Sequence, residues 1–277
     1  MLFFGASAGR SGTMLLANLL NSEAGVTCVH EGKFRLGEES GEQILPFLTL
    51  ENRHGYEYPD KKIEIIATKR PSDVMNELRA KHSYLGDIAY NNSVFVKELA
   101  DQFPQAKFLI SIRDGRDFVR SATVLEGEDL TPVGWSPDNK VLTPLERYIS
   151  LGRLQPRGGD PAKAEWSNWD CFQKNCWLWN ETNTLIYAAL EMLSIDRYHV
   201  IRLEDFKTDG LKTYENIRNF LGLTGDVVDT TEKLLVSRQI NVKSAKDLPH
   251  YSEWTEQMTA VFWKQCAPMM EKLNYVR

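Results

Sequence analysis

The sequence predicts an α/β fold of three layers, in which helices cover both faces of a central, mainly parallel sheet of about five strands. Short apolar runs rich in β-branched residues alternate along the chain with segments whose apolar residues recur at helical spacing. The first strand and the first helix are joined by a glycine-rich loop. The length of 277 residues suits a single domain that spans residues 1–277.

The amino-terminal stretch contains the strongest local signal. The apolar run Leu2–Phe4 predicts a buried strand, the small residues of Gly5–Gly9 predict a loop, and Met14–Leu20 has apolar residues at helical spacing. Backbone N–H groups of Arg10–Thr13 then point outward at the start of the helix, where the helix dipole and the Arg10 guanidinium add positive charge. We therefore expect a phosphate-like anion to bind in this loop.

This loop differs from the phosphate-binding loop of ATP-type enzymes, which reads GxxxxGK[ST]. From Gly5 to Thr13 the chain reads GxxxxRSGT, with Arg10 in the lysine position and Gly12 after the serine. The alternative interpretation is a glycine-rich turn that only lets a helix pack closely on a sheet.

Two further strands are predicted before residue 70. Gly25–Val29 is expected to bring His30 and Glu31 to its carboxyl end, and Ile63–Thr68 is expected to be a central strand that ends at Lys69. Ligands of parallel sheets bind at the carboxyl ends of the strands. These polar side chains are therefore expected to face the same crevice as the glycine-rich loop.

A second strand-turn-helix unit follows later in the chain. Phe108–Ile112 is the clearest strand, and it runs into the charged turn Arg113–Asp117 and a helix that starts at Asp117. His199–Leu203 is expected to be the last strand. Further helices are expected over Ser72–His82, Ser93–Phe103, Pro144–Leu151, Trp166–Leu193 and Tyr214–Leu221, with a terminal helix that ends near Leu273.

Two polar segments, residues 33–60 and 126–161, lack a sustained period and contain many turn-forming residues. Long segments of this kind often form the rim or the cover of an active site. We expect both of them to cover the substrate.

Composition narrows the possible classes of function. The formal net charge of −5 argues against a surface that coats nucleic acid, although it allows a local basic pocket. No apolar run reaches the ~18 residues of a membrane span, and no signal peptide precedes the first strand, so a cytoplasmic location is expected. The 4 cysteines are irregularly spaced, which favours reduced thiols over a disulfide framework or a zinc site.

The RSGT ending of the loop resembles the cofactor motif of sulfotransferases that use 3′-phosphoadenosine 5′-phosphosulfate (PAPS) and release 3′-phosphoadenosine 5′-phosphate (PAP). This resemblance implies the P-loop-NTPase-like fold of that family. It also implies that the 5′-phosphosulfate is held by Gly9, Arg10, Ser11, Gly12, Thr13 and Met14.

A second motif of sulfotransferases is an arginine at a strand end that is followed eight positions later by a serine. Arg113 and Ser121 have this spacing, so the resemblance implies that they hold the 3′-phosphate of the cofactor. In the family a late polar loop closes over the same phosphate. The basic stretch with Lys243, Ser244 and Lys246 resembles this loop more loosely and adds further candidates.

The cofactor motifs are most similar to those of tyrosylprotein sulfotransferases. In those proteins RSGT is followed by a glutamate 21 residues after its arginine, and Glu31 has this interval from Arg10. The same proteins have NKDP where this chain has Thr68–Pro71, and RDGR where it has Arg113–Arg116. The match covers the chain roughly to Thr123.

The resemblance implies a mechanism of in-line sulfuryl transfer. Glu31 is the expected base for the acceptor proton, and Lys69 and Arg10 are expected to stabilise the leaving phosphate. His30 is the competing base, because its ordinary pKa is nearer neutrality. In an extended segment the side chains of His30 and Glu31 point in opposite directions, so we expect at most one of them to enter the site.

The expected acceptor is a hydroxyl group of a small molecule, a lipid or a carbohydrate, and no metal, nucleic acid or membrane is expected to take part. Two alternatives remain open at this point. One is a small-molecule kinase of the P-loop class, which would depend on Mg²⁺. The other is a non-catalytic protein of the same fold that binds PAP or another nucleotide and transfers nothing.

Overall fold

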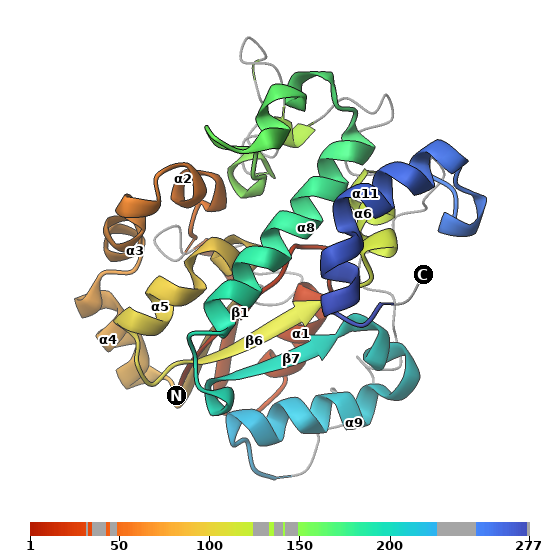
Figure 1. Cartoon of the computed structure of the whole chain (residues 1–277). Helices are drawn as coiled ribbons and strands as arrows, with labels where there is room; N and C mark the ends of the chain where they lie inside the picture. The colour runs from red at the N-terminus through yellow and green to blue at the C-terminus, as the bar shows by residue number, and fades with distance from the viewer. Residues whose placement is uncertain are drawn as a thin grey trace.

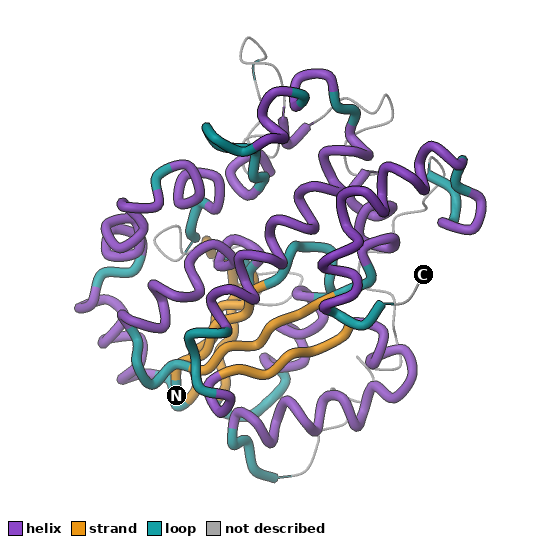
Figure 2. Tube along the Cα trace, viewed as in Figure 1, coloured by secondary structure: helices purple, strands orange, loops and turns teal. Residues whose placement is uncertain are grey.

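Among the described residues, seven strands form one sheet in the order β4-β3-β2-β5-β1-β6-β7. Helices lie on both sides of this sheet (Figures 1 and 2). The structure is a computed structural model that describes residues 1–31, 33–34, 43–44, 49–123, 133–135, 141, 149–225 and 248–275. The strands are β1 (Leu2–Ala6), β2 (Val26–His30), β3 (Lys33–Phe34), β4 (Gln43–Ile44), β5 (Tyr84–Ile88), β6 (Lys107–Ile112) and β7 (Tyr198–Arg202).

Strands β2, β5, β1, β6 and β7 run parallel, which confirms the predicted sheet of about five mainly parallel strands. The two-residue strands β3 and β4 form an antiparallel pair beside β2. Strand β1 lies between β5 and β6, with Phe4 opposite Asp87 on one side and Phe108 on the other. Because the five strands point the same way, the segments after β1, β2 and β6 emerge at one carboxyl edge.

Helices connect the strands and cover both faces of the sheet. Helix α8 begins at a capping box made by Asp170 and Gln173, and α9 ends at Gly222, whose φ of 77° is a left-handed conformation that glycine adopts readily. The helices are α1 (Thr13–Asn21), α2 (Asn52–Glu57), α3 (Lys62–Lys69), α4 (Ser72–Lys81), α5 (Val96–Gln102), α6 (Gly115–Thr123), α8 (Cys171–Leu190), α9 (Leu203–Leu221) and α11 (Glu256–Lys272), with the 3-10 helices η1 (Pro59–Lys61), η2 (Tyr90–Phe95), η4 (Val133–Trp135), η5 (Pro161–Ala164), η6 (Trp166–Asn168), η7 (Ile195–Arg197) and η8 (Tyr251–Glu253).

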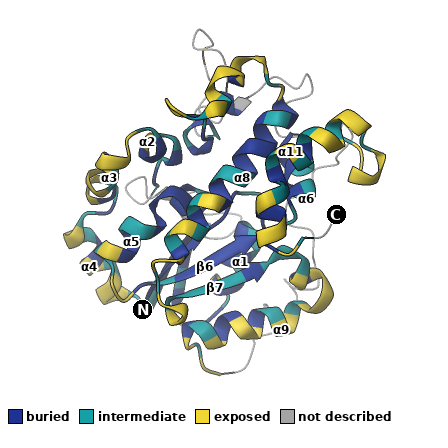
Figure 3. Cartoon of the chain, viewed as in Figure 1, coloured by how far each residue is buried: buried dark blue, intermediate teal, exposed yellow. Residues whose placement is uncertain are grey.

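Alternating side chains along β1 divide the core into two clusters. Phe4 belongs to the cluster that contains buried residues of α5, α6, α8 and α11. Phe3 belongs to the cluster that contains buried residues of α1 and α9. Figure 3 shows β6 and much of α8 buried and β7 mostly intermediate, whereas α3 and α4 are largely exposed. The predicted arrangement of three layers is therefore confirmed.

One predicted strand is wrong. Ile63–Thr68 lies within helix α3, where Ile66 is fully buried but Ile63 is 53% exposed. A central parallel strand is buried on both faces, and this segment is not. Glu64 in the first turn and Lys69 in the last turn both complement the helix dipole. The central place is taken by β5, whose sequence YLGDI has no strand-like alternation.

Tertiary contacts explain why YLGDI forms a strand. A Cβ at Gly86 would collide with the ring of Phe3 on the neighbouring strand, so glycine allows that ring to pack. The buried carboxylate of Asp87 accepts a hydrogen bond from Arg70 Nη2 at 2.6 Å, and Asn92 Oδ1 accepts another from the same nitrogen at 2.7 Å. These partners come from distant segments, so the local sequence does not reveal the strand.

Most other predicted elements are confirmed with shifts at their ends. The helix expected over Tyr214–Leu221 is only the second part of α9, which begins at Leu203 directly after β7. The helix expected from Asp117 begins at Gly115, and the segment Trp166–Leu193 contains η6 before α8. Most of the helix expected over Pro144–Leu151 lies outside the described residues, and so do parts of both covering segments.

Candidate functional site

The loop between β1 and α1 has an unusual backbone. Gly9, Arg10 and Gly12 have φ angles of 89°, 54° and 79°, all in the left-handed region. Glycine adopts this region without strain, whereas the same conformation at Arg10 costs about 1 kcal/mol or more. The Ser7 hydroxyl accepts a bond from Gly9 N–H at 3.0 Å, and the Ser11 hydroxyl donates to the Gly9 carbonyl at 2.8 Å. A loop of this shape directs neighbouring N–H groups into one concavity, which favours anions.

Gly12 precedes α1 and also allows α9 to approach. A Cβ at Gly12 would lie 2.6 Å from Leu203 Cδ1. The first hydrogen bond of α1 runs from Leu16 N–H to the Gly12 carbonyl at 3.0 Å. The N–H group of Thr13 lies before this bond, so it has no acceptor within the helix. Thr13 and Met14, both predicted to bind the cofactor, form the first turn of α1. The positive end of the α1 dipole therefore lies at the glycine-rich loop.

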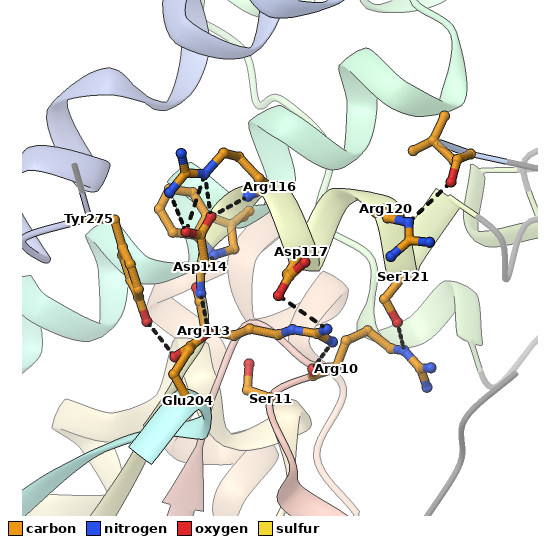
Figure 4. A network of polar contacts seen from close by, with 12 residues as sticks. Arg10, Ser11, Arg113, Asp114, Arg116, Asp117, Arg120, Ser121, Glu204 and Tyr275 are labelled. Atoms are coloured by element: carbon orange, nitrogen blue, oxygen red, sulfur yellow. Dashed lines mark hydrogen bonds and ion pairs between the residues drawn. The ribbon is translucent and has the colours of Figure 1, made fainter. Parts of the chain in front are cut away.

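Two arginines and a serine that are far apart in the sequence meet beside this loop (Figure 4). Arg10 Nε donates to Ser121 Oγ at 2.9 Å, and Arg113 Nη1 donates to the Arg10 carbonyl at 2.9 Å. Arg113 Nη2 also lies 3.7 Å from a carboxylate oxygen of Asp117. The structure thus brings Arg113 and Ser121 to Arg10, and their predicted role in holding the 3′-phosphate stays a prediction.

Positive charge is concentrated at this point. Burial lowers the pKa of Arg10, and the guanidinium groups of Arg113 and Arg153 lower it further, whereas the Glu31 carboxylate opposes the shift. Like charges held close together favour the binding of an anion between them. Nε of Arg113 is buried and has no hydrogen-bond partner among the described residues. An orphaned donor of this kind suits an anionic ligand.

Glu31 follows β2 with a φ of 56°, and among the described residues only Arg10, Glu31 and Asn274 combine a side chain with a left-handed backbone. This conformation interrupts the extended alternation of the strand. As a result, His30 Nε2 lies 3.8 Å from Glu31 Oε1, and the expectation that the two side chains point in opposite directions is wrong. Strained backbone at residues other than glycine clusters at functional sites.

His30, one of the two candidate bases, contacts the residue that follows the glycine-rich loop. Its Nε2 lies within hydrogen-bond distance of Thr13 Oγ1, at 3.1 Å. The backbone of Glu31 is held by a bond from its N–H to the Ile88 carbonyl at 3.3 Å and by the Thr49 hydroxyl, which donates to its carbonyl at 3.2 Å. The side chains of His30 and Glu31 are 13% and 19% exposed, so neither is fully buried.

Lys69 does not lie at the end of a strand. It is the last residue of α3, and its Nζ lies 3.3 Å from Glu51 Oε1 in a partly exposed ion pair. The next residue, Arg70, is fully buried and contacts Asp87 instead. The reason for placing Lys69 at the carboxyl edge of the sheet is therefore removed, and its catalytic role stays a prediction.

Tyr90 and Arg153 also lie near this site, although the sequence analysis did not identify either of them. Tyr90 Cβ lies 3.8 Å from the place of a Cβ at Gly9, and its phenol ring occupies the space that a side chain at Gly152 would need. Burial and the Glu31 carboxylate raise the pKa of Tyr90, whereas Arg153 opposes this shift. Tyr90 follows β5 closely. Because β5 was not predicted from the sequence, nothing in the sequence analysis placed Tyr90 at the carboxyl edge of the sheet.

Three candidates of the late basic loop, Lys243, Ser244 and Lys246, lie outside the described residues. In the part of the chain that the structure describes, no group of three or more His, Cys, Asp or Glu side chains is arranged to hold a metal ion. None of the described helices is both long enough and apolar enough to cross a membrane.

Comparisons with solved structures agree with this fold. No protein-family model matches the chain, and no curated protein sequence matches it. A sulfotransferase from Alicyclobacillus acidocaldarius matches with a TM-score of 0.53 and 15% identity, over 99% of this chain and 96% of that one. The sulfotransferase domain of the Synechococcus olefin synthase matches with a TM-score of 0.53 and 17% identity, over 100% and 95%.

A sulfotransferase from Mycobacterium avium also matches, with a TM-score of 0.54 and 10% identity, over 98% of this chain and 76% of that one. The chain therefore has the sulfotransferase fold, as its motifs predict. The particular similarity to tyrosylprotein sulfotransferases stays a prediction, because it depends on the sequence motifs alone.

Proposed function

We propose that the chain is a sulfotransferase that moves the sulfuryl group of PAPS to a hydroxyl group of an acceptor. The observation that carries the proposal is the meeting of Arg10, Arg113 and Ser121 beside the left-handed glycine-rich loop. Glu31 lies close enough to this cluster to raise the pKa of Arg10. The arrangement combines positive charge for phosphate groups with a carboxylate that can take a proton.

The residues of the cluster fit PAPS. Loop amides within Gly9–Thr13 would hold the 5′-phosphosulfate. Arg113 would hold the 3′-phosphate, because its planar guanidinium suits two phosphate oxygens and its buried Nε has no partner among the described residues. Ser121 accepts the bond from Arg10, so its own O–H can donate to the same phosphate. When bound, PAPS supplies an activated sulfuryl group.

Glu31 is the proposed general base, which takes the proton of the acceptor hydroxyl as the new sulfur–oxygen bond forms. Arg10 then stabilises the negative charge that develops on the leaving phosphate. His30 is the second candidate base, since its Nε2 lies 3.8 Å from Glu31. Lys69 stays a candidate for stabilising the leaving phosphate, and its ion pair with Glu51 would have to open for that role.

The acceptor is proposed to bind beneath segments 33–60 and 126–161. Support comes from the second of these segments, in which Gly152 packs against the Tyr90 ring and Arg153 is only 7% exposed. Arg153 Cζ lies 5.2 Å from the centre of the Trp135 ring, so two described parts of the segment pack together. We propose a small molecule, a lipid or a carbohydrate as the class of acceptor.

Calorimetric titration with PAP and, in parallel, with ATP tests this proposal, each with and without Mg²⁺. The sulfotransferase proposal predicts that PAP binds without metal and more tightly than ATP. A preference for ATP with Mg²⁺ would refute it and support a kinase.

Binding alone does not separate an enzyme from a nucleotide-binding protein of the same fold. The second measurement is therefore transfer of ³⁵S from labelled PAPS to a panel of hydroxyl compounds. Transfer that is lost in Glu31→Gln supports the proposed enzyme, whereas tight PAP binding with no transfer to any class of acceptor supports the non-catalytic alternative.

A further inference from the structure

The carboxylate of Glu204 joins three segments of the chain (Figure 4). Its Oε1 accepts a hydrogen bond from Asp114 N–H at 3.0 Å, and its Oε2 accepts one from the Tyr275 hydroxyl at 3.0 Å. Asp114 lies in the turn between β6 and α6, Glu204 in the first turn of α9, and Tyr275 beyond the end of α11. One side chain therefore connects the segment after α11 to the turn that presents Arg113.

Tyr275 is held in a defined position. The chain turns after α11 through Asn274, whose φ is 55°, and Tyr275 N–H donates to the Met270 carbonyl at 2.8 Å. The Arg202 guanidinium lies over the Tyr275 ring, 4.7 Å from its centre. Burial and the Glu204 carboxylate both raise the pKa of Tyr275, so its hydroxyl stays protonated and donates.

The turn after β6 is held by contacts on both sides of the Arg113–Asp114 peptide. Trp179 Nε1 donates to the Arg113 carbonyl at 3.2 Å, and Glu204 accepts the Asp114 N–H. The Asp114 side chain contacts Arg116 Nη2 at 2.6 Å. With its peptide fixed in this way, Arg113 directs its guanidinium to the Arg10 carbonyl in the glycine-rich loop.

We infer that Glu204 and Tyr275 are positioning residues for Arg113, and that binding of the 3′-phosphate depends on the segment after α11. This inference rests on the proposed function, because it assigns Arg113 to the 3′-phosphate of the cofactor. The Tyr275 hydroxyl holds the Glu204 carboxylate, and that carboxylate holds the Asp114 amide. When the Tyr275 hydroxyl is removed, the Arg113–Asp114 peptide can adopt more conformations, and the Arg113 guanidinium is no longer fixed in the position that binds the phosphate.

Tyr275→Phe tests the inference, because it removes one hydroxyl and keeps the ring under Arg202. Calorimetric Kd values for PAP and for 5′-AMP, which lacks the 3′-phosphate, are compared in the full chain. We expect PAP binding to weaken roughly threefold to tenfold, the scale of one hydrogen bond, while the Kd for 5′-AMP stays unchanged. An equal loss for both ligands, or no loss for either, would overturn the inference.

The matched control is Tyr214→Phe. The hydroxyl of Tyr214 also donates to a glutamate, Glu23 at 2.9 Å, but it lies at the far end of α1 from the glycine-rich loop. This variant is expected to unfold at a lower temperature while its ratio of PAP to 5′-AMP affinity stays that of the wild type. A change in this ratio equal to that of Tyr275→Phe would show a general loss of stability and would refute the positioning role.

Amide hydrogen exchange of the ligand-free protein separates this inference from the proposed function. Exchange of the Asp114 amide should be faster in Tyr275→Phe than in the wild type, and unchanged in Tyr214→Phe. If the wild-type protein does not bind PAP, the proposed function fails, and the exchange rate at Asp114 still decides whether Tyr275 holds this turn. An unchanged rate would refute the positioning role in either case.

Discussion

Replacing Arg113 with alanine is the most direct test of the cofactor site. The change removes a guanidinium that donates to the Arg10 carbonyl at 2.9 Å and lies 3.7 Å from Asp117. The pair with Asp117 is partly exposed and contributes about 0 to 1 kcal/mol to stability. The bond to the Arg10 carbonyl contributes about 1 to 2 kcal/mol. The variant should therefore fold, with a modestly lower melting temperature.

The effect of Arg113→Ala on ligand binding should be larger than its effect on stability. Loss of a charge-assisted contact to phosphate weakens PAP binding by about 2 kcal/mol or more, which is roughly 30-fold in Kd. Arg113→Lys keeps the charge but loses the planar fork, so its Kd should lie between those of the wild type and the alanine variant. Calorimetric titration with PAP measures all three affinities.

The control for this series is Arg53→Ala. Arg53 forms an ion pair with Glu57 at 3.2 Å, four residues later on α2, and this pair is partly exposed, somewhat more so than that of Arg113 and Asp117. Its removal should leave the Kd for PAP within about twofold of the wild-type value. Unchanged PAP affinity in Arg113→Ala would remove Arg113 from the cofactor site.

Three further predictions concern the base, the loop and a partly buried carboxylate. Glu31→Gln should lower turnover by about 10² or more, as expected for a lost general base, while the Kd for PAP stays nearly the same. Gly12→Ala should lower the melting temperature and abolish PAP binding, because its φ is 79° and the new Cβ would lie 2.6 Å from Leu203. Burial raises the pKa of Glu181, so the folded chain binds this proton more tightly than the unfolded chain. The resulting stability is fully present below the ordinary glutamate pKa and is lost as pH rises through the raised value. Melting temperatures measured across this pH range should therefore fall more steeply in the wild type than in Glu181→Gln.

Each of these predictions has a matched control. Turnover retained by Glu31→Gln and lost by His30→Gln would move the base to His30. Gly222→Ala introduces the same left-handed strain, at φ 77°, where a Cβ has no neighbour within 4 Å, so it should lower stability but keep PAP binding. Glu191→Gln removes an exposed carboxylate. If it changed the pH dependence of the melting temperature as much as Glu181→Gln does, that dependence could not be assigned to Glu181.

The cofactor half of the site could be predicted because its signals are local. An apolar strand, a glycine-rich or charged turn and a helix follow one another within about 20 residues in both units, and each pattern predicts its element independently of the rest of the chain. Parallel strands then bring the turns after β1 and β6 to one edge of the sheet. The resemblance to sulfotransferases, and not the strand pattern alone, is what assigned Arg113 and Ser121 to the same cofactor as Arg10.

Strand β5 and helix α3 could not be predicted, because their local patterns favour the opposite structures. The isoleucines of Ile63–Thr68 favour a strand, yet only one side of this segment packs against the core. YLGDI contains glycine and aspartate, yet Phe3 and Arg70 supply the contacts that make it a central strand. Contacts between distant segments outweigh intrinsic propensity where a strand is buried on both faces.

The sequence by itself determined the two strand-turn-helix units, their order and the residues that follow β1 and β6, because these depend on short-range patterns and on the direction of parallel strands. Tertiary structure alone decided which segment lies between β1 and β2, that His30 and Glu31 share one side of the chain, and that Tyr90 lies beside the glycine-rich loop. It also decided that Glu204 and Tyr275 connect the segment after α11 to the turn after β6. These features depend on backbone strain and on long-range contacts, whose free energy arises only when the whole chain is packed.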